Sequence, residues 1–199
     1  MDPDGEGVGL DVERGVGGLF RRGDVDSSGV LDLSDAEMAE HVKECDAITS
    51  CLGHNLTFKG LYGKPRRLVT DATRRLCEAA KVSRPDAKTK FVLMNTTGNR
   101  NEDLPERRTV GEGIVIGLLR RLLPPHSDNE QAAEHLRVSV GKDDPRLEWV
   151  AVRPDGLTNE TEVGQYDLYP SPIRSPIFDA GKTSRINVAH FMARLLTED

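Results

Sequence analysis

The chain lacks the residue patterns of several specialised protein classes. Only three of its 199 residues are cysteines, Cys45, Cys51 and Cys77, and they form no Cys-x-x-Cys pair and no metal-ligand spacing. No basic block offsets the formal net charge of −6, because the arginines stand in short pairs along expected helices. These absences disfavour a disulfide framework, a metal centre and a nucleic-acid partner.

Long apolar runs are missing as well. The longest aliphatic stretch, residues 114–123, is interrupted by Gly117 and by Arg120-Arg121, so no segment is expected to span a membrane. The N-terminus is acidic and lacks the basic-then-apolar pattern of a secretory signal. We therefore expect a reduced, cytoplasmic protein without a membrane partner.

The N-terminal segment differs in composition from the rest of the chain. Residues 1–29 contain eight of the 19 glycines, many acidic residues and little periodicity. Such a segment buries little apolar surface, whereas the remaining length suffices for one domain with a sizeable core. We predict a poorly ordered or divergent segment over residues 1–29 and a single domain over residues 30–199.

Three short apolar runs, at residues 47–52, 91–94 and 147–153, are typical of strands buried in a sheet. The middle run continues directly into Asn95, Thr96 and Thr97. Ligands collect beyond the carboxyl ends of such strands in open α/β sheets, so these side chains are candidates for a ligand site. The alternative is a strand that simply ends in a polar loop. Residues 30–33 and 166–169 are candidates for further short strands.

Helical spacing and capping signals predict the helices between these strands. Ser34 to Glu37 is a capping box for a helix over 34–44, and Pro65 suits the first turn of a helix over 65–81. Ser127 to Glu130 is a second capping box, for a helix that reaches Val140 and ends at Gly141. A helix over 110–123 is apolar nearly all round, and an amphipathic helix covers 187–196. Strands that alternate with helices predict an α/β, Rossmann-like fold with a mainly parallel sheet and right-handed crossovers.

The residues of the three strands also carry a family resemblance. The succession Cys45-Asp46-Ala47-Ile48, Phe91-Val92-Leu93-Met94-Asn95-Thr96 and Trp149-Val150-Ala151-Val152-Arg153-Pro154 resembles the atypical short-chain dehydrogenase/reductase superfamily. The most similar branch is its NAD(P)-binding, NmrA-like and biliverdin-reductase-like members, and residues 183–189 resemble that branch's lead into its final helix. The resemblance covers about residues 30–197 and implies NADP or NAD as the cofactor.

The resemblance implies a role for particular residues. Thr96 matches the position of the family's catalytic serine or threonine, whose hydroxyl would bind a substrate carbonyl. The implied cofactor contacts are Asp32 and Leu33 beside the adenine, Cys51, Leu52, Gly53 and His54 at the ribose, Asn95 after the middle strand, and Pro154, Asp155 and Leu157 beside the nicotinamide. Asp32 and Leu33 also fit a plain turn before a helix, and Gly53 a plain turn.

The sequence lacks the family's glycine-rich phosphate turn. Neither Gly5-x-Gly7 nor Gly15-x-Gly17 continues to a third glycine or follows an apolar strand. Only 31 residues precede Asp32, whereas a complete lead-in needs roughly 60, because one βαβ unit takes about 30 or more. We therefore expect an N-terminally incomplete Rossmann-like domain with impaired cofactor binding. Truncation, a mispredicted start and a degenerate form are equally compatible with the sequence.

The family's Tyr-x-x-x-Lys pair is also replaced. The aligned positions hold His126 and Glu130, so His126 is the candidate proton donor. The simpler interpretation makes His126 a loop residue and Glu130 the capping-box glutamate. The predicted function is an NAD(P)H-dependent reductase of a small carbonyl or conjugated substrate. The alternatives are a non-catalytic NmrA-like sensor or interaction module, or a truncated, inactive gene product.

Overall fold

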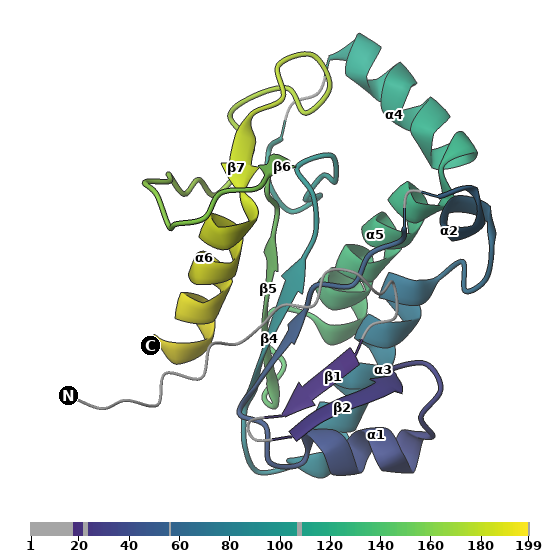
Figure 1. Cartoon of the computed structure of the whole chain (residues 1–199), viewed down its shortest axis with the longest axis vertical. Helices are drawn as coiled ribbons and strands as arrows, with labels where there is room; N and C mark the ends of the chain where they lie inside the picture. Colours follow the sequence, from purple (N-terminus) through teal and green to yellow (C-terminus); the bar gives the residue numbers. More distant parts are fainter. Residues whose placement is uncertain (1–17, 22–23, 56, 107–108, 199) are drawn as a thin grey trace.

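The computed structural model describes residues 18–21, 24–55, 57–106 and 109–198. At its centre is a parallel sheet of three strands in the order β3-β4-β5, where β3 is Ala47–Ser50, β4 is Thr89–Met94 and β5 is Leu147–Val152 (Figure 1). The register pairs Ile48 with Phe91, and Phe91 with Trp149. The structure confirms all three predicted strands, and the middle run, which continues into Asn95, is the central strand.

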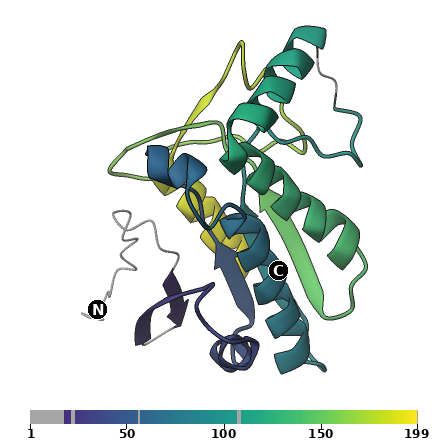
Figure 2. The same ribbon diagram turned by 90° about the vertical axis from the view of Figure 1, so that its right-hand side faces the viewer.

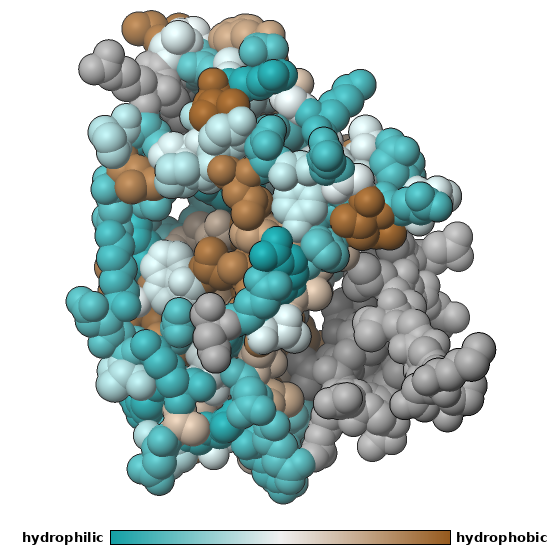
Figure 3. Space-filling model, turned by 90° about the vertical axis from the view of Figure 1, so that its left-hand side faces the viewer, coloured by the Kyte–Doolittle hydropathy of each residue, from teal (hydrophilic) through white to brown (hydrophobic). Residues whose placement is uncertain are grey.

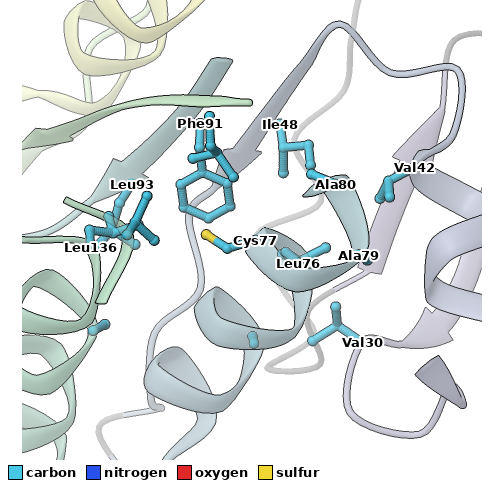
Figure 4. Close-up of a cluster of buried hydrophobic side chains, with 14 of the residues drawn as sticks. Val30, Val42, Ile48, Leu76, Cys77, Ala79, Ala80, Phe91, Leu93 and Leu136 are labelled. Atoms are coloured by element: carbon cyan, nitrogen blue, oxygen red, sulfur yellow. The ribbon is translucent and has the colours of Figure 1, made fainter. Parts of the chain in front are cut away.

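Helices cover both faces of this sheet. Helices α3 (Leu68–Ser83) and α5 (Pro124–Glu134) lie on one face, and α6 (Arg185–Thr197) lies on the other (Figure 2). Phe91 and Leu93 point to the first face, where they pack against Cys77 and Leu136 (Figure 4). Between them Val92 points to the other face, where it packs against α6 at Val188 and Met192. This two-sided burial confirms the predicted α/β, Rossmann-like architecture.

Helix α1 (Asp35–Val42) begins at the predicted capping box. The Ser34 hydroxyl accepts a hydrogen bond from the Glu37 amide, and the Glu37 carboxylate accepts one from the Ser34 amide at 2.8 Å. The strand predicted at residues 30–33 is wrong, because this segment is a turn in which the Asp32 amide donates to the Gly29 carbonyl at 2.8 Å. Arg75 of α3 fixes the turn by donating to the carbonyls of Val30 and Leu33.

The second predicted capping box is wrong. Two prolines after α4 (Val110–Leu122) begin α5 at once, so Ser127 stands inside the helix and caps nothing. Asp128 caps another helix: its carboxylate accepts hydrogen bonds from the amides of Val69 at 2.8 Å and Thr70 at 3.0 Å, in the first turn of α3. A carboxylate at a helix N-terminus satisfies amides that have no partner within the helix and complements the helix dipole.

Two further contacts complete the surroundings of the Asp128 carboxylate. The Thr70 hydroxyl donates to it at 2.6 Å, and the Nε2 atom of His54 lies 2.7 Å from it. The Asp128 and His54 side chains are only 1% and 6% exposed. Asp128 therefore ties three parts of the chain together: α5, the start of α3 and the loop that follows β3.

The remaining elements include several that periodicity did not predict. They are a hairpin of β1 (Gly18–Arg21) and β2 (Asp24–Gly29), the short helix α2 (Phe58–Tyr62), and the parallel pair β6 (Gly156–Thr158) and β7 (Lys182–Ser184). The strand predicted at residues 166–169 is wrong, because no strand forms there. Helix α5 continues as a π-helical segment, His135–Val140, and ends as predicted at Gly141, whose φ of 79° suits glycine.

The residues of the predicted N-terminal segment are only partly described. The β1–β2 hairpin belongs to it, whereas residues 1–17 and 22–23 lie outside the described residues, so the boundary at residue 29 stays a prediction. Across the described part of the chain, none of the helices has both the length and the apolar composition needed to cross a bilayer.

Replacing the buried cap should cost far more stability than replacing the exposed one. We expect Asp128→Ala to lower the free energy of unfolding by about 3 kcal/mol, because it removes an α3 cap and leaves buried partners unsatisfied. Ser34→Ala, the matched change at the exposed α1 cap, should cost about 1 kcal/mol. Urea unfolding of the two variants measures both values, and equal losses would contradict the central position of Asp128.

Candidate functional site

The carboxyl ends of the three parallel strands meet at one edge of the sheet, followed by the loops at residues 51–55, 95–99 and 153–155. Backbone hydrogen bonds join two of these loops. The Asn95 amide donates to the Val152 carbonyl at 2.7 Å, and the Thr97 amide donates to the Pro154 carbonyl at 3.3 Å. This edge is where an open α/β sheet binds its ligands.

Asn95 organises the loop that follows β4. Its side-chain oxygen accepts hydrogen bonds from the Thr96 amide at 2.8 Å and from the Asn99 side chain, while its Nδ2 donates to the Asn129 carbonyl at 3.0 Å. The residue is 8% exposed. Through these bonds Asn95 positions Thr96 and joins the loop to α5, and its role as a cofactor contact stays a prediction.

The structure brings together the two residues proposed as catalytic. A Cβ atom added to Gly98 would stand 3.5 Å from Cε1 of His126 and 3.7 Å from the Thr96 hydroxyl oxygen. Thr96 and His126 therefore both lie within 4 Å of one point beside Gly98. The hydroxyl oxygen of Thr96 also accepts a hydrogen bond from the Gly98 amide at 3.3 Å, and this leaves the hydroxyl hydrogen to donate elsewhere.

His126 lies in the first turns of α5 and not in a loop. Its Nε2 is buried and has no hydrogen-bond partner among the described residues, although it lies 3.5 Å from a carboxylate oxygen of Glu130. Glu130 itself accepts two hydrogen bonds from Arg120, at 2.6 and 2.8 Å. Burial alone would raise the pKa of the Glu130 carboxyl, but His126 and Arg120 outweigh it and lower the pKa to about 2.

Glu130 therefore has a different role from the one that its sequence context indicates. It caps no helix, because α5 begins six residues earlier at Pro124. It stands beside His126 as a carboxylate that stays ionised across the physiological range.

Some residues of the loop after β3 are exposed to solvent, and others point into the protein. Cys51 and Gly53 are exposed, and a Cβ atom added to Gly53 would meet nothing within 4 Å. Leu52 packs against the core, and His54 turns inward with its Nε2 committed to Asp128. Of the four residues predicted to border the cofactor ribose, Gly53 has the most open surroundings.

Among the described residues, no hydrogen bond or ion pair connects Asp32 or Leu33 to this edge of the sheet. They lie in the turn before α1, which is at the lower end of the molecule in Figure 1. Leu33 packs against the core, and its carbonyl is held by Arg75. The structure supports their simpler interpretation as a turn before a helix.

A large hollow lies beside β5, between α5 and the segment that joins β6 to β7. Its volume is about 1360 Å³, and its wall includes Thr97, Glu130, Pro154 and Asp155. Figure 3 shows a narrow opening towards the left of the drawn face, above its middle. The hollow thus reaches the strand-end loops, and its size suits a small substrate together with part of a larger ligand.

Asp155 and Leu157, both predicted beside the nicotinamide, have different surroundings. Asp155 packs so closely on Gly181 that a Cβ atom there would stand 2.2 Å from its carboxylate, so a side chain at Gly181 would force the carboxylate to move. Leu157 packs into the core beside α6 with Val188 and is not among the residues that line the hollow. Only Asp155 of this pair is placed to meet a ligand in the hollow.

Arg153 was not singled out from the sequence, although it shapes the site. Its guanidinium forms two hydrogen bonds with the Glu106 carboxylate, at 2.6 and 3.0 Å, and one with the Asn99 carbonyl at 2.9 Å. These bonds hold the segment between residues 99 and 106 against the end of β5. An arginine after a strand gives no signal of a partner 47 residues earlier.

Comparison with known proteins agrees with this arrangement. A family model described as NAD(P)H-binding matches residues 26–199. The chain belongs to this NAD(P)H-binding family. No curated protein and no solved structure matches the chain. The family match confirms the resemblance stated from the sequence, and nicotinamide cofactor binding is the property that it supports.

The ion pairing of Glu130 predicts a dependence of stability on pH. The pKa of Glu130 is lowered from 4.5 to about 2, so its contribution to stability is present above pH 4.5 and is lost as the pH falls towards 2. After allowance for partial exposure we expect about 1–2 kcal/mol. Glu130→Gln should therefore reduce the loss of stability between pH 5 and 2.5, measured by urea unfolding. Glu134→Gln, at an exposed ion pair of the same helix, is the control and should change this loss little.

Proposed function

We propose that the protein is an NAD(P)H-dependent reductase of a small carbonyl or conjugated substrate, with its active site at the carboxyl edge of the sheet. The observation that carries the proposal is the pairing of Thr96 and His126 around Gly98, in a chain of the NAD(P)H-binding family. A hydroxyl and an imidazole at the end of the central strand are the two groups that carbonyl reduction needs from the protein.

The strand-end loops fit the nicotinamide half of the cofactor. Gly53 offers an open backbone, and Pro154 and Asp155 line the hollow together with Thr97. When bound, the cofactor supplies the hydride. Two described helix N-termini are already occupied: Asp128 holds the amides of α3, and the Thr109 hydroxyl accepts from the Glu112 amide in α4. The pyrophosphate would therefore need other donors.

The roles of Thr96 and His126 follow from their hydrogen bonding. Thr96 would donate its free hydroxyl hydrogen to the substrate carbonyl oxygen and so polarise the bond. His126, beside the ionised Glu130, would donate a proton to the oxygen as negative charge develops on it. Arg120 keeps Glu130 ionised and fixed, so it is a positioning residue.

A second candidate is a non-catalytic sensor that binds the cofactor without turnover. This candidate is favoured because polar groups near the sheet edge already form hydrogen bonds within the protein. They include Asn95, His54 and the first amides of α3. The two candidates differ in hydride transfer and not in cofactor binding. Binding alone therefore does not distinguish them.

Calorimetric titration with NADPH and NADP⁺, followed by turnover with a panel of small aldehydes, ketones and enones, tests the proposal. We expect cofactor binding and measurable NADPH oxidation. Thr96→Val and His126→Gln should each lower kcat about 100-fold while the cofactor Kd changes less than threefold. Ser139→Ala, on the exposed side of the π-helical segment, serves as the control and should leave both values unchanged.

Three results would separate the possibilities. Folded protein that binds neither nucleotide would contradict the proposal altogether. Nucleotide binding together with no turnover of any substrate in the panel would favour the sensor. Turnover that survives both Thr96→Val and His126→Gln would place the reaction elsewhere in the molecule.

A further inference from the structure

Helix α4 exposes a row of four apolar side chains to solvent. Val110, Ile114, Leu118 and Leu122 recur every four residues, and their exposed fractions are 83%, 68%, 55% and 53%. Side chains four apart lie on one face of a helix, so these four form a continuous ridge along α4. Soluble helices normally turn such a ridge inward.

The opposite side of α4 is the one that packs against the protein. Glu112 and Ile116 are its buried residues, at 5% and 1% exposure. By helical geometry both lie on the side of α4 opposite the ridge. The helix is apolar nearly all round, and a helix of this kind is usually buried on every side. One of its two apolar faces has no cover among the described residues.

Aromatic rings extend the apolar surface at both ends of α4. Phe178, 66% exposed, lies where a Cβ atom on Gly111 would touch its ring at 3.7 Å. At the other end the Tyr62 hydroxyl donates to the Leu122 carbonyl, and the ring of Tyr62 packs against that of Phe58. At roughly 100 Å² for each of these seven side chains, the surface is about 700 Å², close to the approximately 800 Å² per partner of a standard interface.

The surface is also shaped to receive an identical helix. Gly113 and Gly117 lie beside the ridge, again four residues apart, and a Cβ atom added to either would meet nothing within 4 Å. They leave a shallow groove with the same spacing as the ridge. Ridges and grooves of this spacing pack into one another when two helices cross at about −50°.

We propose that the α4 surface is a homodimer interface, in which α4 of a second copy packs across it in antiparallel orientation with each ridge in the other's groove. A two-fold axis through the middle of the ridge, between Ile114 and Leu118, satisfies both copies at once. This orientation also separates the two copies of Arg121 by roughly 15 Å along the helix, beyond the screening length of about 8 Å at physiological ionic strength. A parallel pairing would place them side by side. The interface is independent of the proposed reductase activity.

Sedimentation velocity of the full chain between 1 and 100 μM tests the interface. The chain has a mass of 21.9 kDa, and we expect a shift towards twice this mass as the concentration rises. Leu118→Glu should leave a monomer throughout this range. Val138→Glu places the same charge at an apolar side chain that is 61% exposed on another surface, so it should dimerise as the wild type does.

A second variant distinguishes specific packing from general apolar adhesion. Gly117→Leu adds apolar surface but fills the groove, so it should weaken the dimer at least tenfold, with helicity checked by circular dichroism. Three outcomes would overturn the proposal: a wild-type monomer at 100 μM, unchanged dimerisation of Leu118→Glu, or stronger association of Gly117→Leu. A wild-type monomer that binds anionic phosphatidylserine vesicles through the ridge would assign the surface to a membrane instead.

Discussion

The hydrogen bonds of the buried Asp128 carboxylate hold the candidate site together. From α5 this group caps α3, accepts from the Thr70 hydroxyl and contacts His54 after β3. The adjacent residue, Asn129, receives the Asn95 side chain through its carbonyl. The loops after β3 and β4 are thus both anchored to the same turn of α5, which also carries His126 and Glu130. A charge buried this deeply is tolerated because every contact described for it comes from a donor or an imidazole.

These hydrogen bonds also determine which polar groups at the edge of the sheet remain available to a ligand. The Asn95 side-chain amide and the His54 imidazole, which the family resemblance assigned to the cofactor, form hydrogen bonds that hold the loops. The Thr96 hydroxyl hydrogen and the open surroundings of Gly53 remain for a ligand, and the hollow beside β5 reaches this edge through Thr97 and Pro154. In the proposed function, this edge is the place where nicotinamide and substrate would meet.

Local signals in the sequence were sufficient for the main elements. The apolar runs predicted β3, β4 and β5 because each strand is short and buried, and the Ser34 capping box works through residues three apart. Asp128 could not be assigned in this way, because its partners lie 58 to 74 residues away. Its position within a Ser-x-x-Glu pattern even suggested the wrong helix. The β6–β7 pair was missed because each strand has three residues and its partner follows a long irregular segment.

The candidate site residues stay a prediction, and their contacts could not be predicted from the sequence. Thr96 and His126 were chosen by family resemblance, and the structure brings them together, whereas Asp32 and Leu33 lie in a turn that Arg75 fixes elsewhere. The pairing of Glu130 with Arg120 depends on the angle between α4 and α5. The periodicity of the sequence does not predict that angle. Arg153 and Glu106 depend in the same way on where a loop returns to the sheet.

The most direct measurement of the central claim is hydrogen–deuterium exchange with and without NADPH. If the cofactor binds at the carboxyl edge of the sheet, amides in residues 51–54, 95–99 and 153–157 should exchange more slowly in its presence, while those in residues 30–33 stay unchanged. Protection confined to residues 30–33, or none at the strand-end loops despite saturating NADPH, would contradict it.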